Sequence, residues 1–244
     1  MRAWFPLLLL LANACSPSTE VAVAGFHDLH DFKDKSSLPL LEVQEMQTAL
    51  GWSLYLGKDD QLYDLMSIDA GEPPYPYGYS ELEGDDPALL AGTGPGEIII
   101  QVDTTNILSL PHYPELPEDL PVEQWLTWPE ENKKEVQAYP VYIWNAGSHT
   151  AALDAEDWSL NPIVEAKDER GDWRPIEFIQ HSGCGNSYWT LLLKPDYYVI
   201  TSIYRYTGDF ETEMRVAVAS AYSKPFRGSI NKSQFINTKP AEQY

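Results

Sequence analysis

The chain has 244 residues, with 37 Asp and Glu against 16 Lys and Arg, and a formal net charge of −21 at pH 7. This charge argues against a nucleic-acid partner, because such binding depends largely on Lys and Arg contacts to phosphates, and against passive adsorption to anionic lipid. The sequence has no D-x-[DN]-x-[DN]-G loop, so solubility explains the acidic excess better than calcium binding does.

The first 14 residues have the features of a secretory signal peptide. Arg2 supplies a positive charge, and the apolar run at residues 3–12 is too short to cross a bilayer, which takes about 20 residues. The following LANAC at residues 11–15 resembles a bacterial lipobox, in which the cysteine is lipidated and becomes the new N-terminus. Asn13 departs from the usual form of that motif. Despite Asn13, the position of Cys15 in this motif leads us to predict that Cys15 is lipidated.

Two cleavage sites are open. An ordinary signal peptidase would cut after the A-x-A pattern of residues 12–14 and leave the Cys15 thiol free. If Cys15 is lipidated, its acyl chains hold the protein firmly on a membrane, and residues 15–25 comprise the lipidated cysteine and a tether. Ser16 in place of Asp resembles the signal of enterobacterial lipoproteins that leave the inner membrane. We expect a protein of the bacterial cell envelope, anchored at the outer membrane and extracytoplasmic.

Residues 26–92 are assigned to a small α+β region with an acidic linker rich in Pro and Gly. The apolar spacing at residues 39–50 predicts a helix that ends at Gly51. GWSLYL and QLYDLMSI, on either side of residues 57–60, predict a hairpin with a turn of about four residues. A continuous helix is the alternative. Residues 71–96 are predicted to be a linker or long loop.

From residue 97 onward, short apolar segments alternate with turn signals. Strands are predicted at residues 97–103, 139–144, 173–179, 187–193, 197–206, 212–219 and 222–230, with residues 162–167 leading into a turn at 168–172 and residues 104–135 forming a long proline-rich connection. Met214, Val216 and Val218 are spaced two residues apart and so point to one face, as a half-buried strand requires. The pattern predicts an antiparallel β-sandwich over residues 93–236, followed by a tail at 237–244.

HSGCGNSYW at residues 181–189 places a thiol three residues after a histidine. Three extended residues span about 10 Å, so His181 reaches Cys184 only if the flanking glycines turn the chain back. The surroundings match neither papain-like nor caspase signatures. We favour a buried structural cysteine. A Cys15–Cys184 disulfide, which requires that Cys15 is not lipidated, and a catalytic thiol are the alternatives.

Aromatic residues are the candidate ligand-binding residues. Tyr75, Tyr77 and Tyr79 alternate in PPYPYGYS, and Trp125 and Trp128 lie in the proline-rich connection. Exposed aromatic side chains on loops stack on sugar rings or anchor protein partners. Coverage of the sandwich core is the alternative role for these five residues.

No cofactor or metal site is predicted. HDLHD at residues 27–31 has two histidines at helical spacing but no evident third ligand. The sequence contains no G-x-S-x-G, P-loop or H-E-x-x-H motif.

The expected function is non-catalytic: a surface binding or accessory module for a glycan or protein partner. The alternative is a secreted hydrolase that uses Cys184 with His181, or a carboxylate pair.

Three short motifs occupy the C-terminal half. They are C-G-N-S-Y at residues 184–188, then Tyr206, Gly208, Phe210, Thr212 and Arg215, and finally G-S-I-N at 228–231 with Gln234 and Phe235. On these motifs, residues 137–236 resemble uncharacterised surface lipoproteins of the Bacteroidota type. The resemblance implies an immunoglobulin-like β-sandwich and a surface location, and it carries over no activity.

Overall fold

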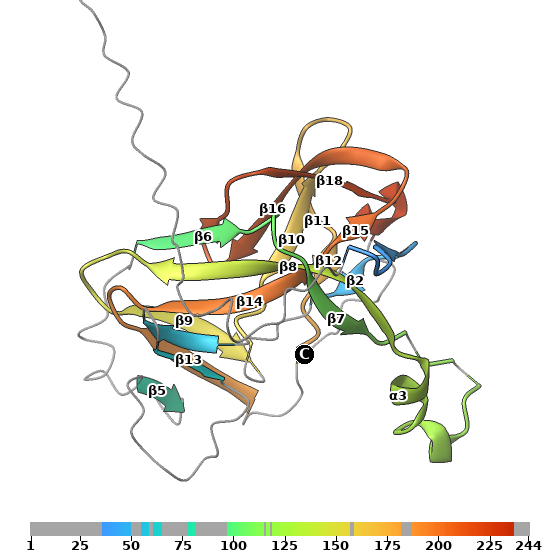
Figure 1. The fold of residues 1–244 in the computed structure, drawn as a ribbon, viewed down its shortest axis with the longest axis horizontal. Helices are drawn as coiled ribbons and strands as arrows, with labels where there is room; N and C mark the ends of the chain where they lie inside the picture. The colour runs from blue at the N-terminus through green and yellow to red at the C-terminus, as the bar shows by residue number, and fades with distance from the viewer. Residues whose placement is uncertain are drawn as a thin grey trace, which may run out of the picture.

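The computed structural model builds the described residues after residue 97 mainly from β-strands (Figure 1). The residues that it describes are 36–49, 55–58, 61–64, 78–81, 97–114, 116–117, 119–156, 159–181 and 187–236. Within them the protein is mainly β, with several largely antiparallel sheets and one short α-helix. This architecture is consistent with a β-sandwich, and it lacks the alternation of strands and helices that an α/β fold requires.

The largest sheet in the described part of the chain is built around β8, a strand of 12 residues. Its strands in spatial order are β4 (Gln61–Asp64), β3 (Tyr55–Lys58), β14 (Tyr198–Tyr204), β8 (Lys134–Asn145) and β6 (Ile98–Val102), and β7 (Leu108–His112) also pairs with β8. One half of β8 pairs with β6 and the other half with β7. Residues 136–143 of β8 are all buried, as expected for a strand covered on both faces.

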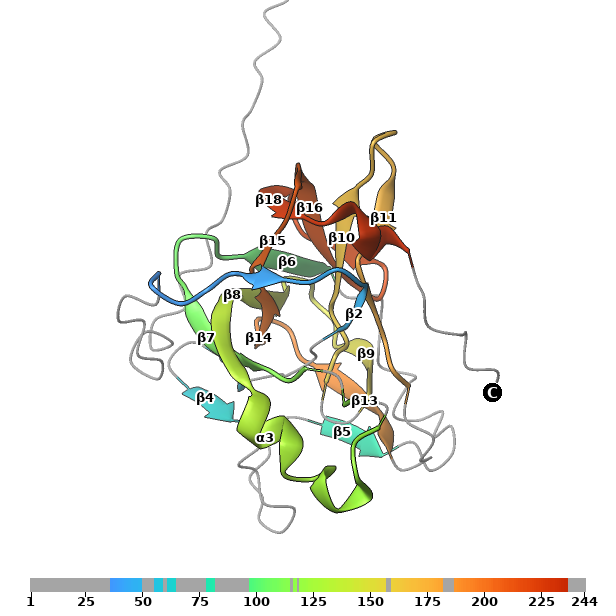
Figure 2. The ribbon, with the colours of Figure 1, turned by 90° about the vertical axis from the view of Figure 1, so that its right-hand side faces the viewer.

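Two further sheets lie on either side of β8 and β14. The second sheet contains β11 (Trp173–Pro175), β10 (Ile163–Lys167), β16 (Phe210–Val218), β17 (Ala221–Tyr222) and β18 (Phe226–Ile230), and the third contains β5 (Gly78–Glu81), β13 (Tyr188–Leu193) and β9 (Ala151–Glu156). In Figures 1 and 2 the second sheet lies above β8 and β14, and the third lies below them. Val141, Ile143, Val164, Val199 and Val216 are fully buried in the core between the sheets.

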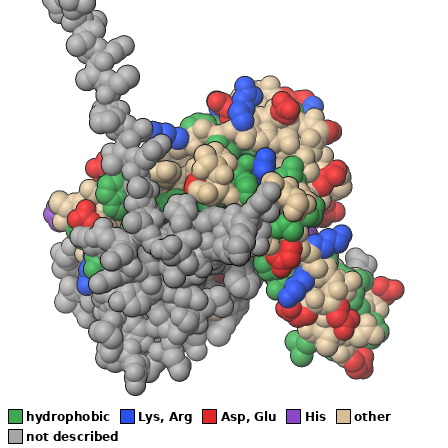
Figure 3. Space-filling model, in the orientation of Figure 1, with side chains coloured by type: hydrophobic (Ala, Val, Ile, Leu, Met, Phe, Trp, Pro, Cys, Tyr) green, Lys and Arg blue, Asp and Glu red, His purple; other side chains and the backbone are tan. Residues whose placement is uncertain are grey.

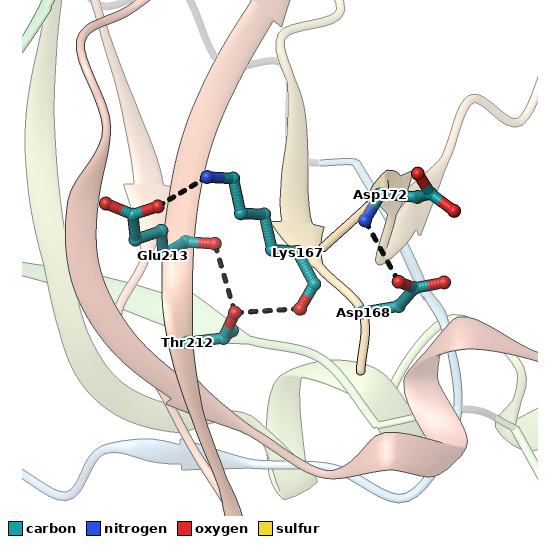
Figure 4. A network of polar contacts seen from close by, with 5 residues as sticks. All are labelled: Lys167, Asp168, Asp172, Thr212 and Glu213. Carbon is teal, nitrogen blue, oxygen red and sulfur yellow. Dashed lines mark hydrogen bonds and ion pairs between the residues drawn. The ribbon is translucent and has the colours of Figure 1, made fainter. Parts of the chain in front are cut away.

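The side-chain alternation predicted for residues 212–219 is confirmed. Met214, Val216 and Val218 are 2%, 0% and 3% exposed, whereas the residues between them are partly exposed. The turn predicted at residues 168–172 is also confirmed. Asp168 Oδ1 accepts a hydrogen bond from the backbone N–H group of Arg170 at 2.8 Å. It accepts another from that of Asp172 at 3.0 Å (Figure 4).

The helix predicted over residues 39–50 is wrong. The described part of this segment is extended and forms β1 (Leu41–Glu42), which runs parallel to β15 (Tyr206–Thr207), and β2 (Gln47–Thr48), which runs parallel to β12 (Glu177–Phe178). Its backbone N–H groups donate to strand carbonyls, as from Ala49 to Phe178 at 2.7 Å. Each pairing is a two-stranded parallel sheet, so bonds to two strands of the C-terminal half replace the bonds of a helix.

The hairpin predicted around residues 57–60 is confirmed, with a shorter turn than expected. β3 pairs antiparallel with β4, and Lys58 opposite Gln61 leaves two residues between the strands. β3 also pairs with β14, and β5 pairs with β13. The described strands between residues 41 and 81 therefore join strands of the C-terminal half.

The long connection predicted for residues 104–135 contains a strand and a helix. β7 includes Pro111, which has no N–H to donate, and prolines of this kind are confined to sheet edges. β7 is such an edge strand, since it pairs only with β8 among the described strands. Because of this proline, the sequence pattern did not predict the strand. β9 (Ala151–Glu156), which was also not predicted, alternates buried and exposed residues up to Ala155 and ends with a buried Glu156.

Residues of the C-terminal motifs close the second sheet. Asn231 begins the short 3-10 helix η3 (Lys232–Phe235) in a capping box with Gln234, and its side-chain amide donates to Val43 O at 2.8 Å. The rings of Phe210 and Phe235 meet edge to face at 6.2 Å. The Thr212 hydroxyl donates to Lys167 O at 2.7 Å (Figure 4). These motif residues hold β16, β18 and the N-terminal segment together.

Candidate functional site

A pocket of about 450 Å³ lies where β15 and β18 approach β8 and the chain before β1. Its lining residues are Leu40, Tyr139, Tyr204, Arg205, Tyr206, Glu211, Met214, Phe226, Arg227, Gly228 and Ser229. Four of them are aromatic, two carry guanidinium groups and one carries a carboxylate. The volume lies within the range of about 300–1,000 Å³ that is usual for ligand sites.

The aromatic side chains form rigid walls of this pocket. Tyr139 packs edge to face against Phe226 with ring centroids 6.1 Å apart, and Tyr204 packs in the same manner against Tyr206 at 6.1 Å. Tyr139, Tyr204 and Tyr206 are each less than 10% exposed. Burial raises the pKa of the Tyr139 phenol, so its hydroxyl keeps its proton at neutral pH.

One of the two guanidinium groups is held in place by its neighbours. Arg205 Nη1 donates to Gln137 Oε1 at 2.7 Å, and the guanidinium lies 5.4 Å from the Tyr139 ring centroid. Gln137 in turn donates from Nε2 to the carbonyls of Ser36 and Leu38. The N-terminal segment, β8 and the pocket are thereby linked through one amide, which orients Arg205.

The other two charged groups of the pocket have no fixed partner. Arg227 and Glu211 are exposed, and neither side chain makes a hydrogen bond or an ion pair with any residue in the described part of the chain. Lys167 and, to a smaller extent, Arg227 lower the pKa of Glu213, which lies opposite Arg227 in the β16–β18 pairing. One cation and one anion are thus available to a ligand at the same pocket.

A buried carboxyl group lies behind the pocket wall. The Tyr206 hydroxyl donates to Glu177 Oε1 at 2.6 Å, and the Val164 N–H donates to Glu177 Oε2 at 2.8 Å. Burial raises the pKa of Glu177 from 4.5 to about 7, although both hydrogen bonds oppose this rise. Glu177 is 3% exposed and does not line the pocket, and both of its oxygens are occupied. Its position is that of a structural group and not of a catalytic acid.

The outer face of the second sheet carries a paired set of charges. The Arg215 guanidinium lies between two rings, 4.4 Å from the Trp173 centroid and 3.8 Å from that of Tyr222, and its Nε contacts Glu165 Oε2 at 2.6 Å. Beside it, Lys167 Nζ contacts Glu213 Oε2 at 2.6 Å (Figure 4). Because these groups satisfy one another, we assign this face a structural role.

The candidate residues from the sequence lie away from the pocket or outside the described residues. Cys15, Cys184, Tyr75 and Tyr77 belong to the latter group. Tyr79 lies in β5, where the backbone pairs it with Leu191. Trp125 is 53% exposed and donates from Nε1 to Leu120 O at 3.1 Å, and Trp128 begins the helix α3 (Trp128–Asn132). His181 Nδ1 lies 2.9 Å from Glu156 Oε2.

Comparisons with protein-family models, with curated proteins and with solved structures give no match to this chain. The site must therefore be interpreted from its own chemistry. In the described part of the chain, no helix is long and apolar enough to cross a membrane. No group of three or more His, Cys, Asp or Glu among those residues is arranged to hold a metal ion.

Sequence reasoning missed the pocket residues, although a weak signal was present. Arg205 stands between two tyrosines in YRY, and Arg227 follows an aromatic residue in FRG. Basic residues beside aromatic ones in predicted strands stand out in a chain with so few cations. The sequence did not indicate that they share one pocket with Tyr139, because β8 is far in the sequence from β15 and β18.

Proposed function

We propose that the protein is a lipid-anchored, non-catalytic binding module of the bacterial cell envelope, and that its pocket binds a glycan chain end carrying an acidic sugar. The observation that carries this proposal is the pairing of Arg205 and Arg227 with aromatic walls in one pocket. These two cations gather there although the chain has a net charge of −21.

Each part of the pocket matches a part of such a ligand. The partly exposed ring of Phe226, backed by the buried ring of Tyr139, presents an apolar face on which a sugar ring can stack. A guanidinium group recognises a carboxylate with two parallel hydrogen bonds. The Glu211 carboxylate can accept hydrogen bonds from sugar hydroxyl groups. Because Arg205 is already oriented by Gln137, part of the entropic cost of binding is removed in advance.

The net charge of the chain restricts the kind of acidic glycan. A long polyanion would be repelled by the acidic surface, whereas a single acidic sugar presents little charge beyond the pocket. At physiological ionic strength charges separated by more than about 8 Å are largely screened. A terminal acidic sugar on an otherwise neutral chain therefore fits the pocket better than a polyuronate does.

Binding of defined oligosaccharides tests this function. We expect the wild-type protein to bind a neutral disaccharide extended by one terminal glucuronic acid, and to bind the matched neutral trisaccharide weakly or not at all. Arg227→Ala should weaken binding of the acidic sugar by about 10- to 100-fold, since a hydrogen bond to a charged group contributes about 1.5–3 kcal/mol. Isothermal titration calorimetry at 0.15 M salt measures both effects.

Arg170→Ala is the matched control for this measurement. Arg170 lies in the exposed turn between β10 and β11 and does not line the pocket, so its loss removes the same charge elsewhere. Equal binding of the acidic and neutral sugars, or equal losses in both variants, would contradict the proposal. Thermal unfolding of each variant shows whether the fold is retained.

The location is tested by the mass of the mature protein. The LANAC motif and the resemblance to surface lipoproteins support an acylated Cys15. We expect protein extracted from membranes to begin at Cys15 and to weigh more than the bare chain by the mass of its acyl groups. Cys15→Ser should release the protein from the membrane fraction or leave it uncleaved. An unmodified Cys15 at the N-terminus would refute the anchor.

A further inference from the structure

An arm projects from the sheets between β7 and β8. We define the arm as residues 113–133, which include the 3-10 helix η1 (Val122–Gln124) and α3. Figures 1 and 2 show it extending away from the layers. No described residue of the arm is buried. Its shape is held instead by local hydrogen bonds, such as those from Gln124 N–H to Pro121 O at 2.9 Å and from Glu131 N–H to Thr127 O at 3.0 Å.

The arm exposes large apolar side chains that it does not need for its own folding. Leu126 is 90% exposed, Val122 62%, Trp125 53% and Leu116 44%. Half of the large apolar side chains that are exposed in the described part of the chain are on this arm. We call these four side chains the apolar patch; exposed apolar side chains that include a tryptophan are typical of a protein-binding surface.

Exposed acidic side chains lie on the same arm as this apolar patch. Asp119, Glu123, Glu130 and Glu131 are exposed on the arm, and only Glu130 is paired, with Lys133 at 2.7 Å. Figure 3 shows the arm at the lower right with apolar and acidic side chains next to one another. An apolar centre with a charged rim is the usual anatomy of an interface, and the rim selects the partner by charge.

We propose that the arm is a docking surface for a protein partner whose apolar patch is ringed by Lys and Arg. A second copy of this chain would bring the same acidic rim and a charge of −21 against the first. An anionic membrane is disfavoured for the same reason. The proposal does not depend on the pocket, because none of the pocket residues belongs to the arm.

Two charge-matched variants test the arm. Leu126→Asp places a charge on the most exposed apolar side chain of the arm, and Ile236→Asp places the same charge on another side chain that is 60% exposed and lies outside the arm. The probe is a synthetic amphipathic helix made of Leu and Lys, with a Leu and Glu helix of equal length for comparison. Binding to the full-length protein is measured by fluorescence anisotropy of the labelled peptide at 0.15 M salt.

We expect the basic helix to bind, and Leu126→Asp to weaken that binding about tenfold or more. Ile236→Asp should leave it unchanged or slightly stronger, because general attraction to an acidic protein increases with negative charge. Equal binding by both variants, or binding of the acidic helix, would overturn the proposal. So would vesicle binding or dimerisation of the wild-type protein that Leu126→Asp abolishes, since a membrane or a second copy would then be the partner.

Discussion

Gly208→Ala is expected to lower the free energy of unfolding by about 4 kcal/mol, among the largest effects of a single substitution. A Cβ atom at this position would lie 2.1 Å from the Ile230 carbonyl carbon and 2.2 Å from the Asn231 nitrogen. Both are backbone atoms, so neither can rotate away as a side chain would. The end of β18 and the cap of η3 would have to move. Urea unfolding followed by tryptophan fluorescence measures the loss.

Two other glycines provide graded controls for Gly208. At Gly228 an added Cβ would meet the Met214 sulfur at 2.3 Å, which is part of a flexible side chain, so Gly228→Ala should cost less. Gly171 has φ +84° with nothing within 4 Å of the added atom, so alanine there should cost only about 1 kcal/mol of backbone strain. Equal losses at Gly208 and Gly171 would show that close backbone packing is not the cause.

The second large effect is a decrease in stability as the pH rises from about 4.5 through about 7. The pKa of Glu177 is raised from 4.5 to about 7 in the folded state, chiefly by burial. Over this range the folded protein holds a proton that the unfolded chain has released, so stability falls with rising pH. Each tenfold change in an ionisation equilibrium corresponds to about 1.4 kcal/mol, so the loss is about 3 kcal/mol.

Glu177→Gln isolates this contribution. The amide has the shape of the protonated acid: its oxygen can accept from Val164 N–H, and its NH₂ group can donate to the Tyr206 hydroxyl oxygen. We expect this variant to lose the part of the pH dependence that falls between pH 4.5 and 7. The measurement is the free energy of unfolding in urea at half-unit steps of pH, compared with wild type.

Tyr206→Phe provides the opposite test. The Tyr206 hydroxyl donates to Glu177 and thereby lowers the pKa of that carboxyl group. Without it the pKa of Glu177 should rise further, and the loss of stability should extend to higher pH than in wild type. If wild type and Glu177→Gln have the same pH dependence, Glu177 is not the group that titrates.

Much of the β-structure could be predicted from the chain alone, because local chemistry specifies it. Turn residues at 168–172 and 207–209 interrupt apolar runs, and the alternation of Met214, Val216 and Val218 has the period of a strand. The segment at residues 39–50 could not be predicted in this way. Its apolar spacing also fits a helix. The segment is extended because its backbone pairs with β15 and β12.

The sequence by itself determined the mainly β class, most of the strands after residue 97, and the hairpin of β3 and β4, since periodicity and turn chemistry act between near neighbours. Only the tertiary structure decided the pocket, the buried Glu177 and the exposed arm. Burial and charge pairing there depend on residues that packing brings together, such as Gln137 with Arg205 and Glu177 with Tyr206. A pattern of neighbouring residues does not record whether a carboxyl group is buried or a tryptophan is exposed.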